Sequence, residues 1–343
     1  MLDSGRFCSE NREMSFTQNV LQAYSVKITG LTSLGSAGGF SGARFWRVET
    51  PTATLCLRRW PSEHPSPARL QSIHRILSHV YQQGITEVPV PLVSRKGSTM
   101  VHQDDHLWEL TPWMPGSADY HRQPTRPRLI AAMQLLARFH QATEALAAEP
   151  GVRRPSPGLN QRLELLDQLL ADQARQIAVA AENDALTDRQ NRARALLEAF
   201  TNLAPRVRAR LVTAARANVP LQPCLRDIWH DHVLFMGEQT SGLVDFGAMR
   251  EETVAADVGR LLASLVRGDR SAWQVGLDAY CQQRRLDSTE LQLLDVFVPT
   301  TALLSGMNWL RWMYLENRVF EHYDRVLQRI DDNLGDLRRT DSF

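Results

Sequence analysis

The chain has 343 residues, about twice the usual size of a single domain, so two packed units or one large enzyme-sized domain are expected. Apolar residues make up 43% and charged residues 22%, as in ordinary soluble globular proteins. The 39 basic and 38 acidic residues give a net charge of +1, which excludes the broad positive surface of a nucleic-acid binder or a polybasic membrane protein. Any anionic ligand must therefore be held by a local group of residues.

The four cysteines are scattered and form no Cys-x-x-Cys pair, so neither a zinc ribbon nor a disulfide framework is indicated. No apolar run approaches about 18 residues, and the N-terminal segment lacks the apolar core of a signal peptide. We therefore expect a cytoplasmic protein without a membrane or nucleic-acid partner. Lysine is almost absent: Lys27 and Lys96 are the only lysines, so 37 of the 39 basic residues are arginines.

The first 110 residues alternate between strand patterns and one helix pattern. Residues at helical spacing predict a helix over 67–83. The predicted strands cover 27–34, 43–48, 52–57, 88–93 and 100–110. This order indicates an antiparallel sheet with one helix.

The rest of the chain is mainly helical. Thr125 is suited to cap a helix that has Pro127 in its first turn. Residues 155–218 predict two or three amphipathic helices, a short β-like region follows over 224–244, and helices return from Asp257 onward. We therefore expect a small β-rich unit over 1–116 and a large helical unit over 117–343.

A glycine-rich turn with Gly35, Gly38, Gly39 and Gly42 separates the first two predicted strands. Glycine lets backbone N–H groups approach phosphate oxygens closely, and Ser41 adds a hydroxyl donor. The turn lacks the strand-to-helix context of Rossmann and Walker loops. Its position between two strands is that of a kinase-type phosphate flap, and an ordinary hairpin turn is the alternative.

Two aspartates lie 18 residues apart, each in a loop beside a short apolar strand. Asp227 follows Cys-Leu-Arg, and Asp245 begins an Asp-Phe-Gly sequence. In phosphoryl transfer, one such aspartate orients the attacking hydroxyl and accepts its proton, and the other ligates the Mg²⁺ that bridges the phosphates. Asp227 alone would be read as a turn residue or a helix cap, but the ordered set of loop and two aspartates favours a phosphoryl-transfer site.

Together these motifs resemble the aminoglycoside phosphotransferase and choline/homoserine kinase family, the small-molecule branch of the protein-kinase-like fold. A hinge that ends in Pro115-Gly116 and a Leu-Ala-Arg-Phe-His motif at 136–140 extend the resemblance over nearly the whole chain. It implies a two-lobe α+β fold, with a small antiparallel β-sheet N-lobe carrying one helix and a large, mainly helical C-lobe. It also implies ATP and Mg²⁺, with Mn²⁺ as an alternative, and a small-molecule acceptor.

The resemblance assigns roles to individual residues. Asp227 would be the catalytic base and Asp245 the magnesium ligand. Gly38, Gly39 and Ser41 would hold nucleotide phosphates.

At the hinge, the resemblance places adenine beside Pro112 and Met114. Proline is acceptable there because that position offers only a carbonyl, while Met114 keeps its N–H as a donor.

Several positions depart from the family pattern. Leu-Arg-Asp replaces His-Gly-Asp at the catalytic loop, and His232 stands where an asparagine metal ligand is usual. Since Mg²⁺ prefers oxygen ligands, a second metal would be weakened, replaced by manganese or absent. Arg58 replaces the strand-three lysine, and His74 stands near the position of its usual acidic partner. Arg58 can still hold phosphate in a bidentate manner, and Glu63 is an alternative partner for it.

The sequence thus predicts transfer of the γ-phosphoryl group of ATP to a hydroxyl of a small metabolite or aminoglycoside-like acceptor. One alternative is a catalytically weakened pseudokinase that binds nucleotide or metabolite as a sensor. Another is a metal-dependent hydrolase built on His230, Asp231 and His232, since alternate residues of an extended segment share a face. Arginines interspersed among the acids of 155–218 argue against a polycationic acceptor.

Two further features bear on the site. His140 lies on the apolar face of its helix and is expected to brace the catalytic loop as a buried histidine. The aromatic residues of 309–314 would either belong to the core or line a pocket for a cationic substrate.

Overall fold

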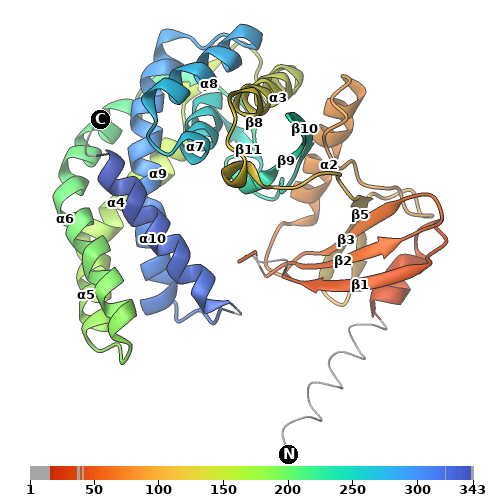
Figure 1. Ribbon diagram of the computed structural model, residues 1–343, viewed down its shortest axis with the longest axis horizontal. Coiled ribbons are helices and arrows are strands. Elements are labelled where there is room, and N and C mark those ends of the chain that lie inside the picture. The colour runs from red at the N-terminus through yellow and green to blue at the C-terminus, as the bar shows by residue number, and fades with distance from the viewer. Residues whose placement is uncertain (1–15, 37–38, 41, 321, 341–343) are drawn as a thin grey trace, which may run out of the picture. The chain divides into compact units, whose positions relative to one another are not determined.

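The computed structural model describes residues 16–36, 39–40, 42–320 and 322–340, which form two compact units (Figure 1). The first unit contains the described residues up to Ser117 and, in addition, the segment Ser241–Gly247. The second contains Ala118–Thr240 and the described chain from Ala248 onward. The N-terminal part of the first unit thus ends at Ser117, and the expected boundary followed residue 116.

The expected division placed all of 117–343 in the helical unit, but the segment Ser241–Gly247 groups with the β-rich unit instead. The hydroxyl of Ser241 donates to the carbonyl of Pro115 at 2.7 Å, and the N–H of Leu243 donates to the carbonyl of Glu87 at 2.7 Å. These long-range bonds have no signature in the local sequence. They make the Asp-Phe-Gly segment part of the first unit.

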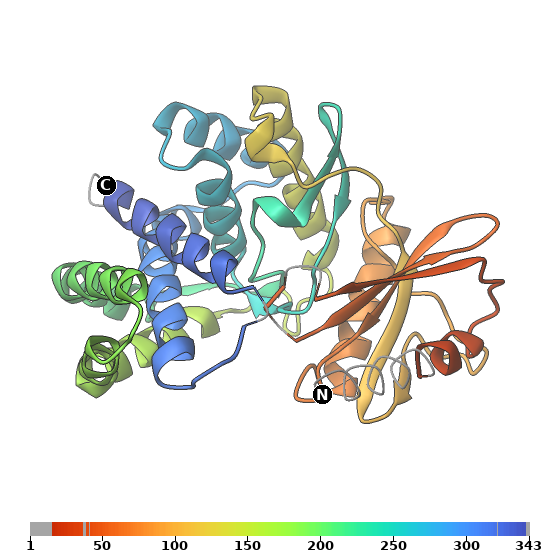
Figure 2. The ribbon, with the colours of Figure 1, turned by 60° about the horizontal axis from the view of Figure 1, so that its bottom comes forward.

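The first unit is built on an antiparallel five-stranded sheet with the order β1-β2-β3-β5-β4. Its strands are β1 (Gly30–Gly35), β2 (Arg44–Glu49), β3 (Thr54–Arg59), β4 (Val101–Gln103) and β5 (His106–Pro112). Helix α2 (Pro67–Gln82) begins after Ser66, whose hydroxyl accepts from the N–H of Arg69 at 3.3 Å. It lies against the sheet (Figure 2), where Leu70 packs with Trp60 and Leu107. The predicted fold class of this unit is confirmed.

Two predicted strands differ from the structure. Residues 88–93 form no strand, because Pro89 and Pro91 lack the N–H groups that a ladder requires. The predicted strand 100–110 is instead the hairpin of β4 and β5, which turns at Asp104 and Asp105 with φ of 53° and 55°. Aspartate tolerates this left-handed conformation, which two-residue hairpin turns need.

The second unit is mainly helical, as predicted. Its helices are α3 (Arg126–Glu144), α4 (Pro157–Gln168), α5 (Ala174–Glu182), α6 (Thr187–Ala214), α7 (Val254–Val266), α8 (Arg270–Gln283), α9 (Ser288–Tyr314) and α10 (Tyr323–Thr340). A π-helical turn, η2 (Leu169–Gln173), joins α4 to α5. The expected cap of α3 is present, since the hydroxyl of Thr125 accepts from the N–H of Arg128 at 3.4 Å.

Short strands lie between these helices along the chain. They are β6 (Arg153–Pro155), β7 (Asn218–Pro220), β8 (Gln222–Cys224), β9 (Val233–Met236), β10 (Gln239–Leu243) and β11 (Arg250–Glu252). Strand β6 pairs with β7, and β8 pairs with β11. The 3₁₀ helix η3 (His230–His232) follows the loop of Asp227.

Helix α9 forms the core of the second unit. It begins with a capping box in which Asp287 and Glu290 each accept a backbone N–H of the other, at 2.8 and 2.9 Å. Its 27 residues are long and apolar enough to cross a membrane by length and composition. Most of that apolar stretch is instead buried, and the helix packs against α6, α7 and α10. We therefore describe it as a core helix.

Gly276 is expected to be essential for the packing of α8. A Cβ at this position would lie 2.5 Å from Cδ1 of the buried Leu262 and 3.2 Å from Cδ1 of Leu129. Gly276→Ala should lower the free energy of unfolding by about 1–3 kcal/mol, measured by denaturant titration. Gly335→Ala is the control, because there a Cβ meets only the end of Arg339, at 3.3 Å, and alanine should favour the helix by about 0.5–1 kcal/mol. Equal stability of the two variants would contradict the packing described.

Candidate active site

The glycine-rich turn has the expected position between two antiparallel strands, β1 and β2. Gly35 ends β1 with φ of 59°, a conformation that favours glycine, and the N–H of Gly39 donates to the carbonyl of Ser36 at 2.9 Å. Two predicted phosphate-binding residues, Gly38 and Ser41, lie outside the described residues. The strand–loop–strand context of a phosphate flap is therefore present.

Arg58 and Asp245, predicted to bind phosphate and metal, lie together in the first unit. Nη1 and Nη2 of Arg58 are each 3.3 Å from Oδ1 of Asp245. The guanidinium of Arg58 lies 3.4 Å from the ring centre of Trp60 and 5.1 Å from that of Phe45. Its Nε is buried and has no hydrogen-bond partner among the described residues. Stacking thus fixes the orientation of the cation, while its donors remain directed at an exposed carboxylate.

His74 stands near the position of the usual acidic partner of the strand-three cation, and it does not pair with Arg58. Its Nε2 is 2.6 Å from Oε2 of Glu109, and its Nδ1 is 2.8 Å from the hydroxyl of Thr99. Glu109 lies opposite Arg58 in the β3–β5 ladder. Glu63, the alternative partner, has an exposed side chain, and the ion pair found for Arg58 is with Asp245.

The backbone of Asp245 is strained. Its φ is 63°, in the left-handed region that residues other than glycine rarely occupy. Two residues later, the carbonyl of Gly247 accepts a hydrogen bond from Nη2 of Arg69 at 2.7 Å. Strain of this kind concentrates at functional sites, where surrounding contacts impose it. The conformation presents the Asp245 carboxylate with 45% of its side chain exposed.

The hinge has a backbone donor available at the predicted position. Pro112 ends β5 and is exposed, and the N–H of Trp113 donates to the carbonyl of Thr54 at 3.1 Å. The N–H of Met114 donates no backbone hydrogen bond to the described part of the chain. This is the arrangement that an adenine acceptor nitrogen requires.

The predicted catalytic loop lies in the second unit, between β8 and η3. Arg226 has a left-handed backbone, with φ of 64°, and Asp227 follows with 52% of its side chain exposed. Nη2 of Arg260, on α7, donates a short hydrogen bond to Oδ1 of Asp227. The predicted catalytic base is thus an accessible carboxylate held by one arginine.

Helix α7 also fixes the backbone of this loop. The carboxylate of the fully buried Asp257 accepts the N–H groups of Leu225 and Arg226, both at 2.6 Å. Nε2 of His140 lies 3.1 Å from the same carboxylate, and its Nδ1 lies 2.7 Å from the hydroxyl of Tyr280. Burial lowers the pKa of His140, so the imidazole is neutral at neutral pH. The prediction that His140 braces the catalytic loop is confirmed, with Asp257 as the intermediate.

His140, Cys224 and Asp257 place their ligand atoms within 4.8 Å of one another, close enough to hold a metal ion. Their chemistry argues otherwise. Burial raises the pKa of the Cys224 thiol, which donates to the carbonyl of Glu252 at 3.2 Å. Asp257 is occupied by backbone amides. This cluster therefore acts as a support of the loop.

The segment 230–232 is a 3₁₀ helix, so the premise that His230 and His232 share the face of an extended segment is wrong. Nε2 of His232 accepts a hydrogen bond from the indole N–H of Trp229 at 2.8 Å. Because an indole nitrogen is only a donor, the lone pair of this Nε2 is already used. A metal-ligand role for His232 would require that bond to break, and it stays a prediction.

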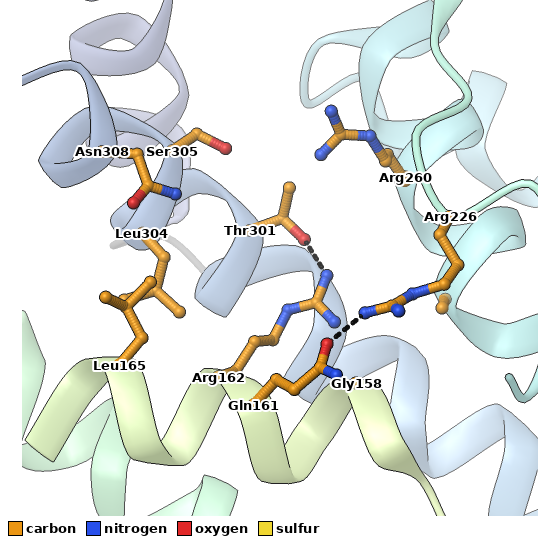
Figure 3. A pocket seen from close by; sticks show the side chains of 11 residues that line it. Gly158, Gln161, Arg162, Leu165, Arg226, Arg260, Thr301, Leu304, Ser305 and Asn308 are labelled. Carbon is orange, nitrogen blue, oxygen red and sulfur yellow. Dashed lines mark hydrogen bonds between the residues drawn. The ribbon is translucent and has the colours of Figure 1, made fainter. Parts of the chain in front are cut away.

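A pocket of about 260 Å³ lies within the second unit, lined by residues of α4, the catalytic loop, α7 and α9 (Figure 3). Arg162, Arg226 and Arg260 reach it from three different elements. Arg226 directly precedes the predicted base in the sequence, and Arg260 hydrogen-bonds to it. This set could not be found from the sequence, because helical periodicity does not show which of the 37 arginines face a common space.

Of the aromatic residues of α9, Trp309 belongs to the core, while Trp312 and Tyr314 are only partly buried. Trp309 is 8% exposed and packs edge-to-face with Trp312 at a centroid distance of 4.9 Å. The part of α9 that lines the pocket is instead polar or aliphatic, with Thr301, Ser305 and Asn308.

Comparison with known proteins identifies the family. The model of the phosphotransferase enzyme family matches residues 35–291, so the chain belongs to this family. No curated protein sequence matches the chain.

Solved structures share its fold, which is the kinase-like fold predicted from the sequence. Spectinomycin phosphotransferase in complex with ADP and spectinomycin is 11% identical, with a TM-score of 0.69 and coverage of 96% of this chain and 98% of that one. An aminoglycoside phosphotransferase from Alicyclobacillus acidocaldarius is 16% identical, with a TM-score of 0.65 and coverage of 94% and 93%. An amicoumacin kinase in complex with AMP-PNP and Ca²⁺ is 14% identical, with a TM-score of 0.64 and coverage of 97% and 96%. At these identities the likeness establishes the fold.

The neutral, buried His140 should make the fold sensitive to acid. Its folded-state pKa is lowered, so below about pH 6.5 the unfolded chain binds protons that the folded chain does not. The free energy of unfolding therefore falls as pH decreases below that value, by at most about 1.4 kcal/mol per pH unit for one such group. The pKa values of His121 and His230 are also lowered, so His140→Gln should reduce this slope without abolishing it.

The measurement is denaturant unfolding at several pH values between about 7 and 5. His102→Gln, at an exposed histidine, is the control and should keep the slope of the natural protein. An unchanged slope in His140→Gln would show that folding does not lower the pKa of this histidine.

Proposed function

We propose that the protein is an ATP-dependent phosphotransferase that transfers the γ-phosphoryl group to a hydroxyl of a small molecule. The observation that carries the proposal is the support of the catalytic loop by α7. Asp257 fixes the two backbone amides before Asp227, and Arg260 orients the Asp227 carboxylate. Family membership and an accessible carboxylate at Asp245 support the same reaction.

The residues of the first unit fit a nucleotide with a divalent metal. Magnesium commonly takes one or two protein carboxylates and completes its coordination with phosphate oxygens and water, so the oxygen donors of Asp245 suit it. The orphaned Nε of Arg58 and the free N–H of Met114 are donors without acceptors among the described residues. When bound, the metal would neutralise charge on the phosphates. Asp245 would hold it, and Arg58 would contact the phosphate oxygens.

In the proposed reaction, Asp227 orients the acceptor hydroxyl and accepts its proton. The hydroxyl oxygen forms a bond to the γ-phosphorus, and the bond between that phosphorus and the β–γ bridging oxygen breaks. The bridging oxygen keeps the electron pair and leaves on ADP. Exposure of Asp227 allows this contact with an acceptor, and Arg260 stabilises its carboxylate before the proton arrives.

A second candidate function is that of a pseudokinase that binds nucleotide as a sensor. One observation favours it: both key carboxylates are paired with arginines, Asp227 with Arg260 and Asp245 with Arg58. A sensor would keep these pairs on binding nucleotide, whereas an enzyme must release Asp227 to the acceptor and Asp245 to the metal. Turnover separates the two functions.

Asp227→Asn removes the proton acceptor without changing the shape of the side chain. We expect kcat for phosphoryl transfer to fall roughly 10²- to 10⁴-fold, measured as ADP release with Mg²⁺ or Mn²⁺ over a panel of sugars, amino alcohols, hydroxy acids and aminoglycosides. Asp167→Asn is the matched control, since this aspartate of α4 has a largely exposed side chain that pairs with Arg208 of α6. Stabilisation of the natural protein by nucleotide without turnover of any acceptor would favour the pseudokinase.

Arg58→Met should raise the KM for ATP roughly tenfold or more, because it removes a charge-assisted contact to phosphate. The KM for the acceptor should change much less. Arg58→Lys keeps the charge but loses the stacking on Trp60, so an intermediate effect is expected. Arg47→Met, at an exposed arginine of β2 that pairs with Glu49, is the control. A KM for ATP that does not respond to Arg58→Met would exclude Arg58 from the nucleotide site.

A further inference from the structure

The pocket of the second unit contains positive charge and no acid among its lining residues. Arg162 extends from α4, Arg226 from the catalytic loop and Arg260 from α7 (Figure 3). The nearby neutral groups include the amide of Asn308 and the hydroxyl of Ser305. Three guanidinium groups around one small space are electrostatically unfavourable unless a partner of opposite charge compensates them.

The buried acid behind the pocket, Glu252, compensates this charge only in part. Glu252 accepts the hydroxyl of Ser156 at 2.5 Å, the N–H of Gly158 at 2.6 Å and the N–H of Thr253 at 2.9 Å. Its carboxylate is thus used by the start of α4, and Nε of Arg226 lies only at 4.0 Å from it. The hydrogen bond of Arg226 is to the neutral amide oxygen of Gln161, at 2.7 Å.

Arg162 and Arg260 also have N–H donors available for a ligand. Arg162 donates to the hydroxyl of Thr301 at 3.1 Å, lies 4.7 Å from the ring of Phe297 and forms no ion pair with a carboxylate of the described residues. Burial lowers the pKa of Arg162 to about 10; Glu252 acts in the opposite direction, and the nearby Arg260 and Arg226 lower it further. Nε of Arg260 is buried without a hydrogen-bond partner among the residues that the structure describes. Both observations indicate that these side chains can bind a further group of negative charge.

We propose that this pocket selects an acceptor that carries an oxyanion, a carboxylate or a phosphate, in addition to the hydroxyl that is phosphorylated. The inference rests on the proposed phosphotransferase function and names its substrate class. Guanidinium groups bind carboxylate and phosphate through paired hydrogen bonds. The pocket volume of about 260 Å³ is near the lower end for small-molecule sites, which fits a small hydroxylated acid.

The position of the pocket connects recognition with chemistry. Arg260 both lines the pocket and donates to Asp227. An oxyanion held by Arg162 and Arg226 would therefore bring the rest of the acceptor to the base that takes its proton. A polycationic aminoglycoside would meet like charge at the same place and be rejected.

The test compares acceptors that differ only in charge. To test for a carboxylate, glycerate is compared with glycerol and gluconate with glucose. To test for a phosphate, glucose 6-phosphate is compared with glucose. Kanamycin serves as the polycation. We expect kcat/KM to be roughly 10- to 100-fold higher for the anionic member of at least one pair. The pair that shows this difference identifies the oxyanion as a carboxylate or a phosphate. Neutral alcohols or kanamycin as equal or better acceptors would overturn the proposal.

Two variants connect the effect to the pocket. Arg162→Gln should raise the KM for the anionic acceptor roughly tenfold and leave the KM for ATP unchanged. Asn308→Asp adds one negative charge with almost no change of volume and should have the same effect, so a folding defect of the first variant would not obscure the result. Arg175→Gln is the control, because its side chain on α5 is 76% exposed and pairs with Asp172. An increase in the KM for ATP instead would mean that the arginines bind nucleotide phosphate.

A binding measurement keeps this inference separate from the proposed function. Calorimetric titration with gluconate and with inorganic phosphate should show binding to the natural protein that Arg162→Gln and Asn308→Asp weaken. Such binding without turnover of any acceptor would contradict the phosphotransferase function and leave the anion site intact. If neither compound binds and no anionic acceptor is preferred, the anion site itself is excluded.

Discussion

The second unit depends on one buried carboxylate. Asp257 is fully buried, a position that would be costly for an ion without partners, and it is stabilised by two backbone amides and by His140. These bonds hold Arg226 in a left-handed conformation that the residue would not adopt by itself. One turn later on the same helix, Arg260 holds the side chain of Asp227. A single helix therefore sets both the backbone and the side-chain position of the proposed catalytic base.

In the first unit, Asp245 is held in a different way. There the strained residue is the carboxylate itself, and its counter-ion is a cation fixed by stacking on Trp60 and Phe45. In both units an aspartate in a loop is opposed by an arginine from a regular element, β3 or α7. Such pairs hold the carboxylates in position without ligands, and a ligand or metal must compete with them. The near absence of lysine makes arginine the cation in both places.

Much of this arrangement was predictable from the sequence. The strand–loop–strand motif, the capped helix α3 and the buried position of His140 follow from local patterns of glycine, proline and apolar spacing. The roles of the two loop aspartates were implied by the resemblance to the family. The strand errors have local causes too, namely the two prolines of 88–93 and the Asp-Asp turn that divides 100–110. The remaining features are long-range. Neither the bond of Leu243 to Glu87 nor the convergence of Arg162 with Arg226 has a periodic signal, because each depends on where distant segments meet.

The stacked Arg58 has a consequence for chemical reactivity. A lysine at this position would be an amine that loses its proton at alkaline pH and reacts with acylating reagents. A guanidinium keeps its charge over that whole range and is a poor nucleophile, and the two lysines of the chain lie outside strand β3. Reagents that acylate lysine side chains would thus leave Arg58, the cation proposed to contact phosphate, unmodified.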